Sequence, residues 1–181
     1  PLDRMINESL PSLVDMYKYL HANPEISYQE EKTSAYVAKE LRSQGFEVTE
    51  RVGNYEQSGR VCYGVVAVLK NGNGPTVLVR TDLDALPLEE KTGLPYASSV
   101  KTKNDTGEEV SVMHACGHDL HMTSFLGTAR MLSKMKNQWR GTLLMLGQPS
   151  EERGSGAVAM LKDGLYTRFP KPDYALALHD N

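Results

Sequence analysis

Three strand-like stretches of this chain each run into residues that can carry chemistry, and this repeated arrangement constrains the fold most. The stretches and the residues that follow them are 76–80 with Asp82 and Asp84, 142–146 with Glu151 and Glu152, and 174–178 with His179. In α/β proteins, ligands gather beyond the carboxyl ends of the sheet strands. The sequence therefore predicts that these five side chains meet at one edge of a sheet.

Segments with the helical spacing of apolar residues separate the strand-like stretches. The predicted helices cover residues 6–22, 28–45, 122–136 and 155–163. An earlier apolar run, residues 61–69, is followed by the turn signal NGNG at 71–74 and then by the strand-like residues 76–80, which predicts a hairpin. Late strands that alternate with helices, together with an early hairpin, favour an α/β fold with a mixed sheet.

The composition excludes several classes of protein. The 181 residues suffice for one buried core, and the 40% hydrophobic and 24% charged residues are ordinary for a globular domain. The net charge of −3 and the scattered basic residues give no footprint for nucleic acid or for an anionic membrane. No apolar run approaches the roughly 20 residues that cross a bilayer. We therefore expect neither a nucleic-acid partner nor a membrane partner.

The start of the sequence bears on the cellular compartment, and its two cysteines have different expected roles. The chain begins at Pro1 without a methionine, so we expect a processed or trimmed N-terminus. The compartment is left open: cytoplasmic, or periplasmic or secreted if a signal peptide was removed. Cys62 lies in an apolar run, where a buried, inert thiol is expected. Cys116 lies among histidines, which indicates metal binding or reactivity instead.

The densest group of potential metal ligands is HACGHDLH, residues 114–121. Thiolate and imidazole are preferred ligands of zinc-like ions. Cys116 and His118 share a face if the backbone between them is extended, and Gly117 relaxes that backbone ahead of the following helix. The alternative is a buried Cys116 with histidines that make local hydrogen bonds at the start of a helix. We favour metal binding.

The adjacent carboxylates of Glu151 and Glu152 form a second candidate. Two neighbouring carboxylates in a cleft are costly unless a cation compensates them. One can then bind the cation while the other moves protons. The alternative is a solvated acidic pair at the start of a helix, where the helix dipole favours negative charge.

Weaker signals come from single aspartates and histidines. Asp82 and Asp84 can orient metal-binding side chains through hydrogen bonds, or can form hydrogen bonds within the turn before Pro87. His179 ends a strand, where a surface histidine is the plainer alternative to a ligand. His21 is most simply a residue at the carboxyl end of a helix.

Five segments together resemble the M20 metallopeptidase family, in particular its aminoacylase-like amidohydrolase branch of hippurate, N-acyl-amino-acid and auxin-conjugate hydrolases. The matching segments are 20–25, 80–87, 113–119, 148–152 and 177–179. They occur in the order of the family and span nearly the whole chain. The resemblance implies a three-layer, zinc-exopeptidase-like domain with a mixed, mainly parallel sheet between helices.

The resemblance also implies roles for individual residues. It assigns two divalent metal ions to four ligands, Cys116, His118, Glu152 and His179, with His118 bridging the two ions. Glu151 is similar to the general base of the family, and Asp84 to the aspartate that supports a ligand. Asp82 stands where other M20 members carry a histidine ligand, so its role is open. Zinc suits this set of ligands, and manganese, cobalt or nickel are also admitted.

The family pattern further implies that residues 1–181 are the N-terminal part of a catalytic domain. The lid domain, which usually forms the homodimer, and a later part with one more metal-binding histidine are absent from this sequence. The chain is thus a fragment or a natural short form, and we expect the chain alone to be inactive.

The function expected from the resemblance is metal-dependent hydrolysis of the amide bond of N-acyl or N-aroyl amino acids, with a metal-activated water and Glu151 as general base. The partner would be such a small molecule or a short peptide. A dipeptidase or carboxypeptidase of the same family and a non-catalytic metal-binding fragment are alternatives. A redox role for Cys116 leaves the paired glutamates unexplained.

Overall fold

The computed structural model describes residues 2–56 and 58–180. Its helices and strands, in chain order, are α1 (Leu2–Ala22), α2 (Glu31–Ser43), β1 (Glu47–Val52), β2 (Gly64–Asn71), β3 (Thr76–Asp82), β4 (Lys101–Lys103), β5 (Glu109–Ser111), α3 (His118–Lys134), a short 3-10 turn (Lys136–Gln138), β6 (Gly141–Gln148), α4 (Gly156–Lys162), α5 (Leu165–Arg168) and β7 (Tyr174–Ala177). Within that part of the chain, no helix combines the length and apolar character needed to cross a membrane.

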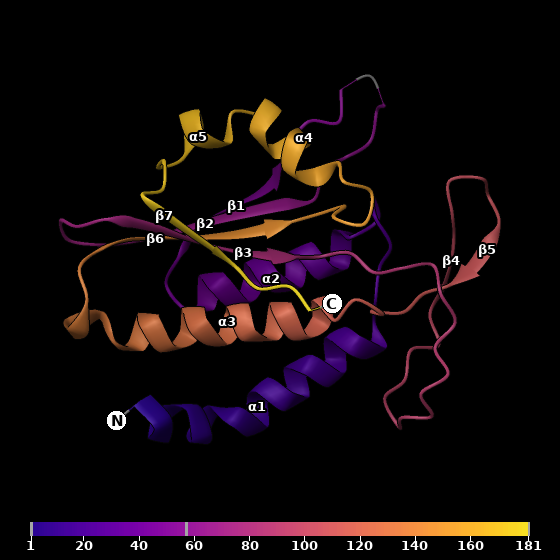
Figure 1. The fold of residues 1–181 in the computed structure, drawn as a ribbon, viewed down its shortest axis with the longest axis horizontal. Helices are drawn as coiled ribbons and strands as arrows, with labels where there is room; N and C mark the ends of the chain where they lie inside the picture. Colours follow the sequence, from indigo (N-terminus) through magenta and orange to yellow (C-terminus); the bar gives the residue numbers. More distant parts are fainter. Residues whose placement is uncertain (1, 57, 181) are drawn as a thin grey trace.

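Five strands form one mixed sheet in the order β1-β2-β6-β3-β7. β2 runs antiparallel to both β1 and β6, whereas β3 runs parallel to both β6 and β7. Helices α4 and α5 cover one face of the sheet, α2 and α3 cover the other, and α1 packs against α3 (Figure 1). This confirms the predicted three-layer α/β fold, with the parallel strands gathered on the side that carries the candidate site.

The alternating side chains of β6 supply the two larger of the three hydrophobic clusters. Leu143 and Met145 point into the core shared with α1, α2 and α3. Leu144 and Leu146 point to the opposite face, into the core beneath α4 and α5. Because successive side chains of a strand face opposite sides, an apolar run without polar interruptions marks a strand that is buried on both faces. β6 is accordingly the central strand of the sheet.

The predicted hairpin between residues 61–69 and 76–80 is wrong. Both runs form strands, β2 and β3, but β6 lies between them and pairs with each. The turn after β2 instead crosses the start of β6, where a Cβ on Gly74 would lie 2.8 Å from the carbonyl oxygen of Arg140. An Asn-Gly pair indicates only that the chain reverses direction, and not that the strands before and after it pair with each other. The apolar residues 143–146 of β6 are buried between β2 and β3, which suits the central position of this strand.

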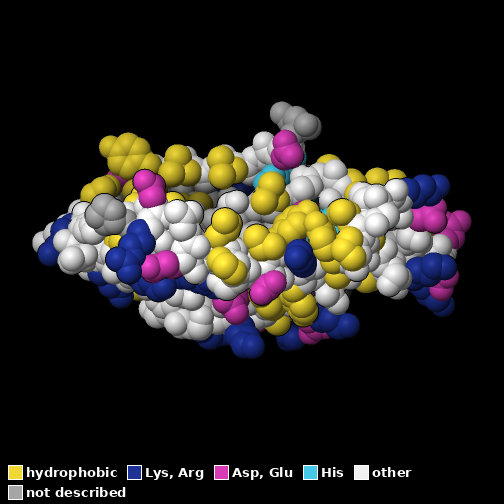
Figure 2. Space-filling view, turned by 90° about the horizontal axis from the view of Figure 1, so that it is seen from below, with side chains coloured by type: hydrophobic (Ala, Val, Ile, Leu, Met, Phe, Trp, Pro, Cys, Tyr) yellow, Lys and Arg dark blue, Asp and Glu magenta, His cyan; other side chains and the backbone are white. Residues whose placement is uncertain are grey.

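The first half of α1 is more exposed than its helical pattern suggested. Leu20 is buried, but Ile6, Leu10 and Val14 are exposed by 39% or more. Figure 2 views the molecule from below, where hydrophobic side chains gather in patches among charged ones. The amphipathic pattern thus correctly predicts the helix, but only its carboxyl-terminal half packs into the core.

β7 is the edge strand nearest the candidate site. It pairs with β3 on one side only, and Tyr174, Leu176 and the following Leu178 are 60 to 71% exposed. The sequence correctly places this strand, and His179 follows two residues after its end. The site therefore borders on the edge of the sheet.

Candidate metal centre

The predicted site residues come from four places that the fold brings together. Asp82 ends β3, His118 begins α3, Glu151 and Glu152 follow β6, and His179 follows β7. The parallel strands end at the same side of the sheet, and the segment after β7 runs to the first turn of α3, where Asp180 contacts His121 (Figure 1). This is the convergence at one sheet edge that the sequence predicts.

The imidazole of His118 lies at the middle of the group. It is 1% exposed, and its Nδ1 lies 2.7 Å from the main-chain oxygen of Asp84. A carbonyl oxygen can only accept, so Nδ1 carries the hydrogen and Nε2 has a free lone pair. That Nε2 lies 3.4 Å from His179 Nε2, 3.6 Å from Glu151 Oε2 and 3.8 Å from Glu152 Oε1. One free nitrogen serves one ion, which leaves the bridging role assigned to His118 without a second donor atom.

Cys116 lies against the same carboxylates. Burial, a hydrogen bond with Glu152 and the charge of Glu151 raise the pKa of its thiol to about 11. Gly117, between Cys116 and His118, has φ of 69°, a left-handed conformation that suits glycine. The backbone between Cys116 and His118 is therefore not extended, whereas the predicted shared face required an extended backbone, and α3 begins at His118 itself and not after it.

Asp84 supports the centre in two ways. Its main-chain carbonyl fixes the ring of His118, whereas its carboxylate accepts hydrogen bonds from the backbone N–H groups of Glu151 at 3.0 Å and Glu152 at 3.1 Å. The hydroxyl of Ser27 donates a further bond of 2.6 Å. Burial raises the pKa of Asp84, and these donated bonds oppose the shift. The carboxylate thus holds the loop of the paired glutamates.

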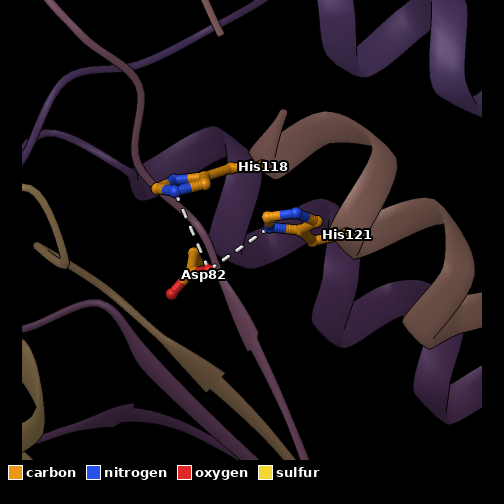
Figure 3. A group of neighbouring side chains, drawn as sticks. All are labelled: Asp82, His118 and His121. Atoms are coloured by element: carbon orange, nitrogen blue, oxygen red, sulfur yellow. Dashed lines mark ion pairs between the residues drawn. The ribbon is translucent and has the colours of Figure 1, made fainter. Parts of the chain in front are cut away.

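Asp82 and His121 form a second group with His118 (Figure 3). Asp82 Oδ2 lies 3.4 Å from His121 Nδ1 and 3.7 Å from His118 Nε2, and Asp82 also pairs with Arg80. His121 Nε2 accepts a hydrogen bond of 2.9 Å from the backbone of Asp180. The sequence prediction did not include His121 among the ligands, although a spacing of three residues places it on the same side of α3 as His118.

The remaining two histidines lie near this region with different surroundings. His21 is buried between Asp119 at 2.6 Å and Glu90 at 2.9 Å, so it does more than end α1. Its burial lowers its pKa, but the two carboxylates outweigh that effect and raise the pKa. Burial and the neighbouring histidines lower the pKa of His114 to about 3, so His114 is neutral.

The residues present fit divalent cations. Two groups of three residues each have potential ligand atoms within 4.8 Å of one another. One group is Asp82, His118 and His121, and the other is His118, Glu151 and His179. Glu152 Oε1 is buried and has no hydrogen-bond partner among the described residues. A buried polar atom without a partner is costly, and a cation beside it would remove that cost. The predicted ligands Cys116 and Glu152 belong to neither group, although Glu152 Oε1 lies 3.8 Å from His118 Nε2 and Cys116 lies beside Glu152. Imidazole and carboxylate, with this thiol nearby, suit zinc and other first-row ions.

Fold and site together define an α/β protein with a candidate centre for divalent ions. The chain belongs to Peptidase family M20/M25/M40, whose family model matches residues 78–181. This confirms the family resemblance found in the sequence.

Proteins of known activity and known structure agree with this assignment. The chain is 41% identical over 162 residues to a hippurate hydrolase of Campylobacter jejuni, which covers 89% of the chain and 37% of that protein. It is 38% identical over 170 residues to thermostable carboxypeptidase 2 of Saccharolobus solfataricus, which covers 92% of the chain and 38% of that protein. The YXEP protein of Bacillus subtilis, described as a dinuclear metal-binding peptidase from the M20 family, superposes with a TM-score of 0.78 at 31% identity, covering 94% of the chain and 43% of that structure. The chain thus spans less than half the length of each.

Proposed function

We propose that this chain forms the metal-binding part of a hydrolase that cleaves the amide bond of N-acyl or N-aroyl amino acids. The observation that carries the proposal is the placement of His179, Glu151 and Glu152 around the one free nitrogen of His118. The similarity to a hippurate hydrolase, over 89% of the chain, supports an N-acyl amino acid as substrate.

Two divalent ions, coordinated by Cys116, His118, Glu152 and His179, would polarise the amide carbonyl and activate a water molecule. Glu152 is the better ligand of the two glutamates, because its buried Oε1 lacks a hydrogen-bond partner among the described residues. Asp82 offers a further donor atom next to His118. Zinc suits this set best because of the thiolate of Cys116.

Glu151 is placed to act as the general base. Its side chain is 30% exposed, compared with 17% for Glu152, and its Oε2 lies 3.6 Å from His118 Nε2 and 4.0 Å from His179 Nε2. A carboxylate at the open side of the centre can accept a proton from the attacking water and then donate it to the departing amine. Asp84 holds the backbone of Glu151 in that place.

The decisive experiment compares Glu151→Gln with Glu152→Gln in the full-length protein. We expect Glu151→Gln to lower kcat by roughly 10²-fold or more, since general acid–base catalysis contributes that much, and to leave metal content unchanged. Glu152→Gln should lower the metal content itself. Wild-type rates for Glu151→Gln, with metal bound, would reject the role of the base.

A second candidate function is that of a dipeptidase or carboxypeptidase. It is favoured by the similarity to thermostable carboxypeptidase 2. The same centre would cleave both kinds of amide, so the two candidates differ in the acyl side of the substrate. Rates on N-acetyl and N-benzoyl amino acids, measured beside rates on a dipeptide, separate them. Metal binding without turnover of any of these would indicate a non-catalytic metal-binding protein.

A further inference from the structure

The residue before the paired glutamates has an unusual backbone. Ser150 is completely buried and has φ of 50°, in the left-handed region. A residue with a Cβ atom is disfavoured in that region, so its surroundings must hold it there. The direction of the chain at Ser150 sets where Glu151 and Glu152 emerge. The contacts of Ser150 therefore bear on the metal centre.

Those contacts centre on Glu30, at the start of α2. The backbone N–H of Ser150 donates to Glu30 Oε1 at 2.7 Å, and the hydroxyl of Ser150 donates to the same oxygen at 3.0 Å. The hydroxyl also accepts from the backbone N–H of Tyr28 at 3.1 Å and from the hydroxyl of Tyr55 at 2.8 Å. Every hydrogen-bonding position of this side chain is thus in use.

The next two residues are held in the same manner by a different carboxylate. The N–H groups of Glu151 and Glu152 donate to Asp84, directly after that of Ser150 donates to Glu30. Three consecutive backbone N–H groups therefore end on two fully buried carboxylates. These hydrogen bonds fix the course of the backbone through the loop. From that backbone, the side chains of both glutamates extend to His118.

Fold stability alone is a poor explanation for Glu30. A buried carboxylate is costly to desolvate, and well-packed apolar residues stabilise a core at least as well. The burial of Glu30 raises its pKa to about 7, against the opposing effect of its hydrogen bonds. What Glu30 supplies, and an apolar residue cannot, is an acceptor for two donors of Ser150.

We propose that Glu30 is a positioning residue of the metal centre, which fixes Ser150 in its left-handed conformation and thereby directs Glu152 toward the ions and Glu151 toward the substrate. The role rests on the proposed function. It adds to that function the residue that precedes α2, a helix whose side chains are absent from the groups of ligand atoms around His118. Glu30 acts on the centre through Ser150.

The test measures binding of Co²⁺ to the chain, with Glu30→Ala, Glu30→Gln and the control Glu31→Ala. Glu31 adjoins Glu30, but its side chain is 61% exposed and pairs with Arg51 at the surface. Changes in residues that support metal ligands typically weaken binding 10- to 100-fold, and we expect Glu30→Ala to do so. Glu30→Gln keeps an acceptor oxygen for Ser150 and should bind within about threefold of wild type, as should Glu31→Ala.

The absorption spectrum of bound Co²⁺ separates positioning from a general loss of structure. At saturating Co²⁺, Glu30→Ala should keep the thiolate-to-cobalt band of Cys116, which lies outside the loop of residues 150–152, while the ligand-field bands shift. An unchanged affinity and spectrum in a folded Glu30→Ala protein would overturn the proposal. If Glu30→Ala does not fold, Ser150→Gly replaces it, since glycine tolerates the left-handed backbone but lacks the hydroxyl. Wild-type binding by Ser150→Gly would equally overturn it.

Failure of the proposed function has a different signature. A wild-type chain that binds no Co²⁺ would overturn the metal centre itself, and the role of Glu30 with it. A wild-type chain that binds Co²⁺, together with variants that bind it equally well, would overturn only the role of Glu30.

Discussion

The Nε2 atoms of His118 and His179 lie 3.4 Å apart, although 61 residues separate the two histidines in the chain. His118 Nδ1 donates to the carbonyl of Asp84, so the free lone pair of His118 faces the ring of His179. Two carboxylates, Glu151 and Glu152, approach the same nitrogen. The nitrogens of the two histidines and the oxygens of the two glutamates thus face one position, as the ligands of a cation do.

His179→Ala should weaken zinc binding to the chain by at least about tenfold, because one imidazole ligand is lost while the others stay. Isothermal titration of the zinc-free protein measures this change. Leu178→Ala is the matched control, since Leu178 is the neighbouring residue and its side chain is 71% exposed. Equal affinities for the two variants would contradict the assignment of His179 as a ligand.

Asp84→Ala should destabilise the fold by roughly 3 kcal/mol or more. The change removes the acceptor of Ser27 and of the backbone N–H groups of Glu151 and Glu152, and each buried donor left unpaired costs about 1–3 kcal/mol. Urea unfolding measures the loss, with the exposed Glu89→Ala as control. A free energy of unfolding within about 0.5 kcal/mol of wild type would show that the loop does not depend on Asp84.

Removal of divalent ions by a chelator should lower the midpoint of thermal unfolding. An ion that binds only the folded state stabilises it by about 2.7 kcal/mol at a concentration 100 times its Kd. Added zinc should restore the midpoint, and the effect should shrink in a Cys116→Ser variant, which replaces a soft thiolate ligand. A midpoint that ignores both chelator and zinc would argue against a metal centre in this chain.

Glu30 should make the chain less stable as pH rises from about 5 to about 7.5. Its pKa of about 7 in the folded state exceeds its ordinary value of 4.5, so the folded state binds the proton more tightly and stability is lost as that proton leaves. The shift corresponds to roughly 3 kcal/mol at most. Urea unfolding at several pH values, as wild type minus Glu30→Gln, isolates this contribution. A difference that stays flat or rises with pH would contradict the raised pKa.

The sequence was sufficient to predict where the candidate site lies, because the signals involved are local. Strand ends followed by carboxylates or a histidine are visible as runs of a few residues, and the fold places Asp82, Glu151, Glu152 and His179 at the same end of the parallel strands. The metal-binding roles of these residues remain predictions. Their proximity to His118, which those roles require, is present in the structure.

The errors concern contacts between distant parts of the chain. Asn71-Gly72 predicts a reversal, but cannot show that β6 inserts between the two strands. His121 was missed because α3 was expected to start after His118, which hid the spacing of three residues between these two histidines. Ser150, which contacts Glu30, and Asp119, which contacts His21, lie 98 or more residues away along the chain. Glu90, which also contacts His21, lies in an irregular loop. No periodic pattern in the sequence predicts these contacts.

The one-sided pairing of β7 also bears on the order in which this region assembles and opens. A strand with a single neighbour and solvent-exposed side chains has few contacts that resist local opening, so its amides should exchange hydrogen sooner than those of β6. His179 is attached to that fraying strand, whereas His118 is anchored in the buried start of α3. An ion bound by both histidines would therefore link this edge strand to the buried start of α3 and make local opening of the sheet edge less frequent.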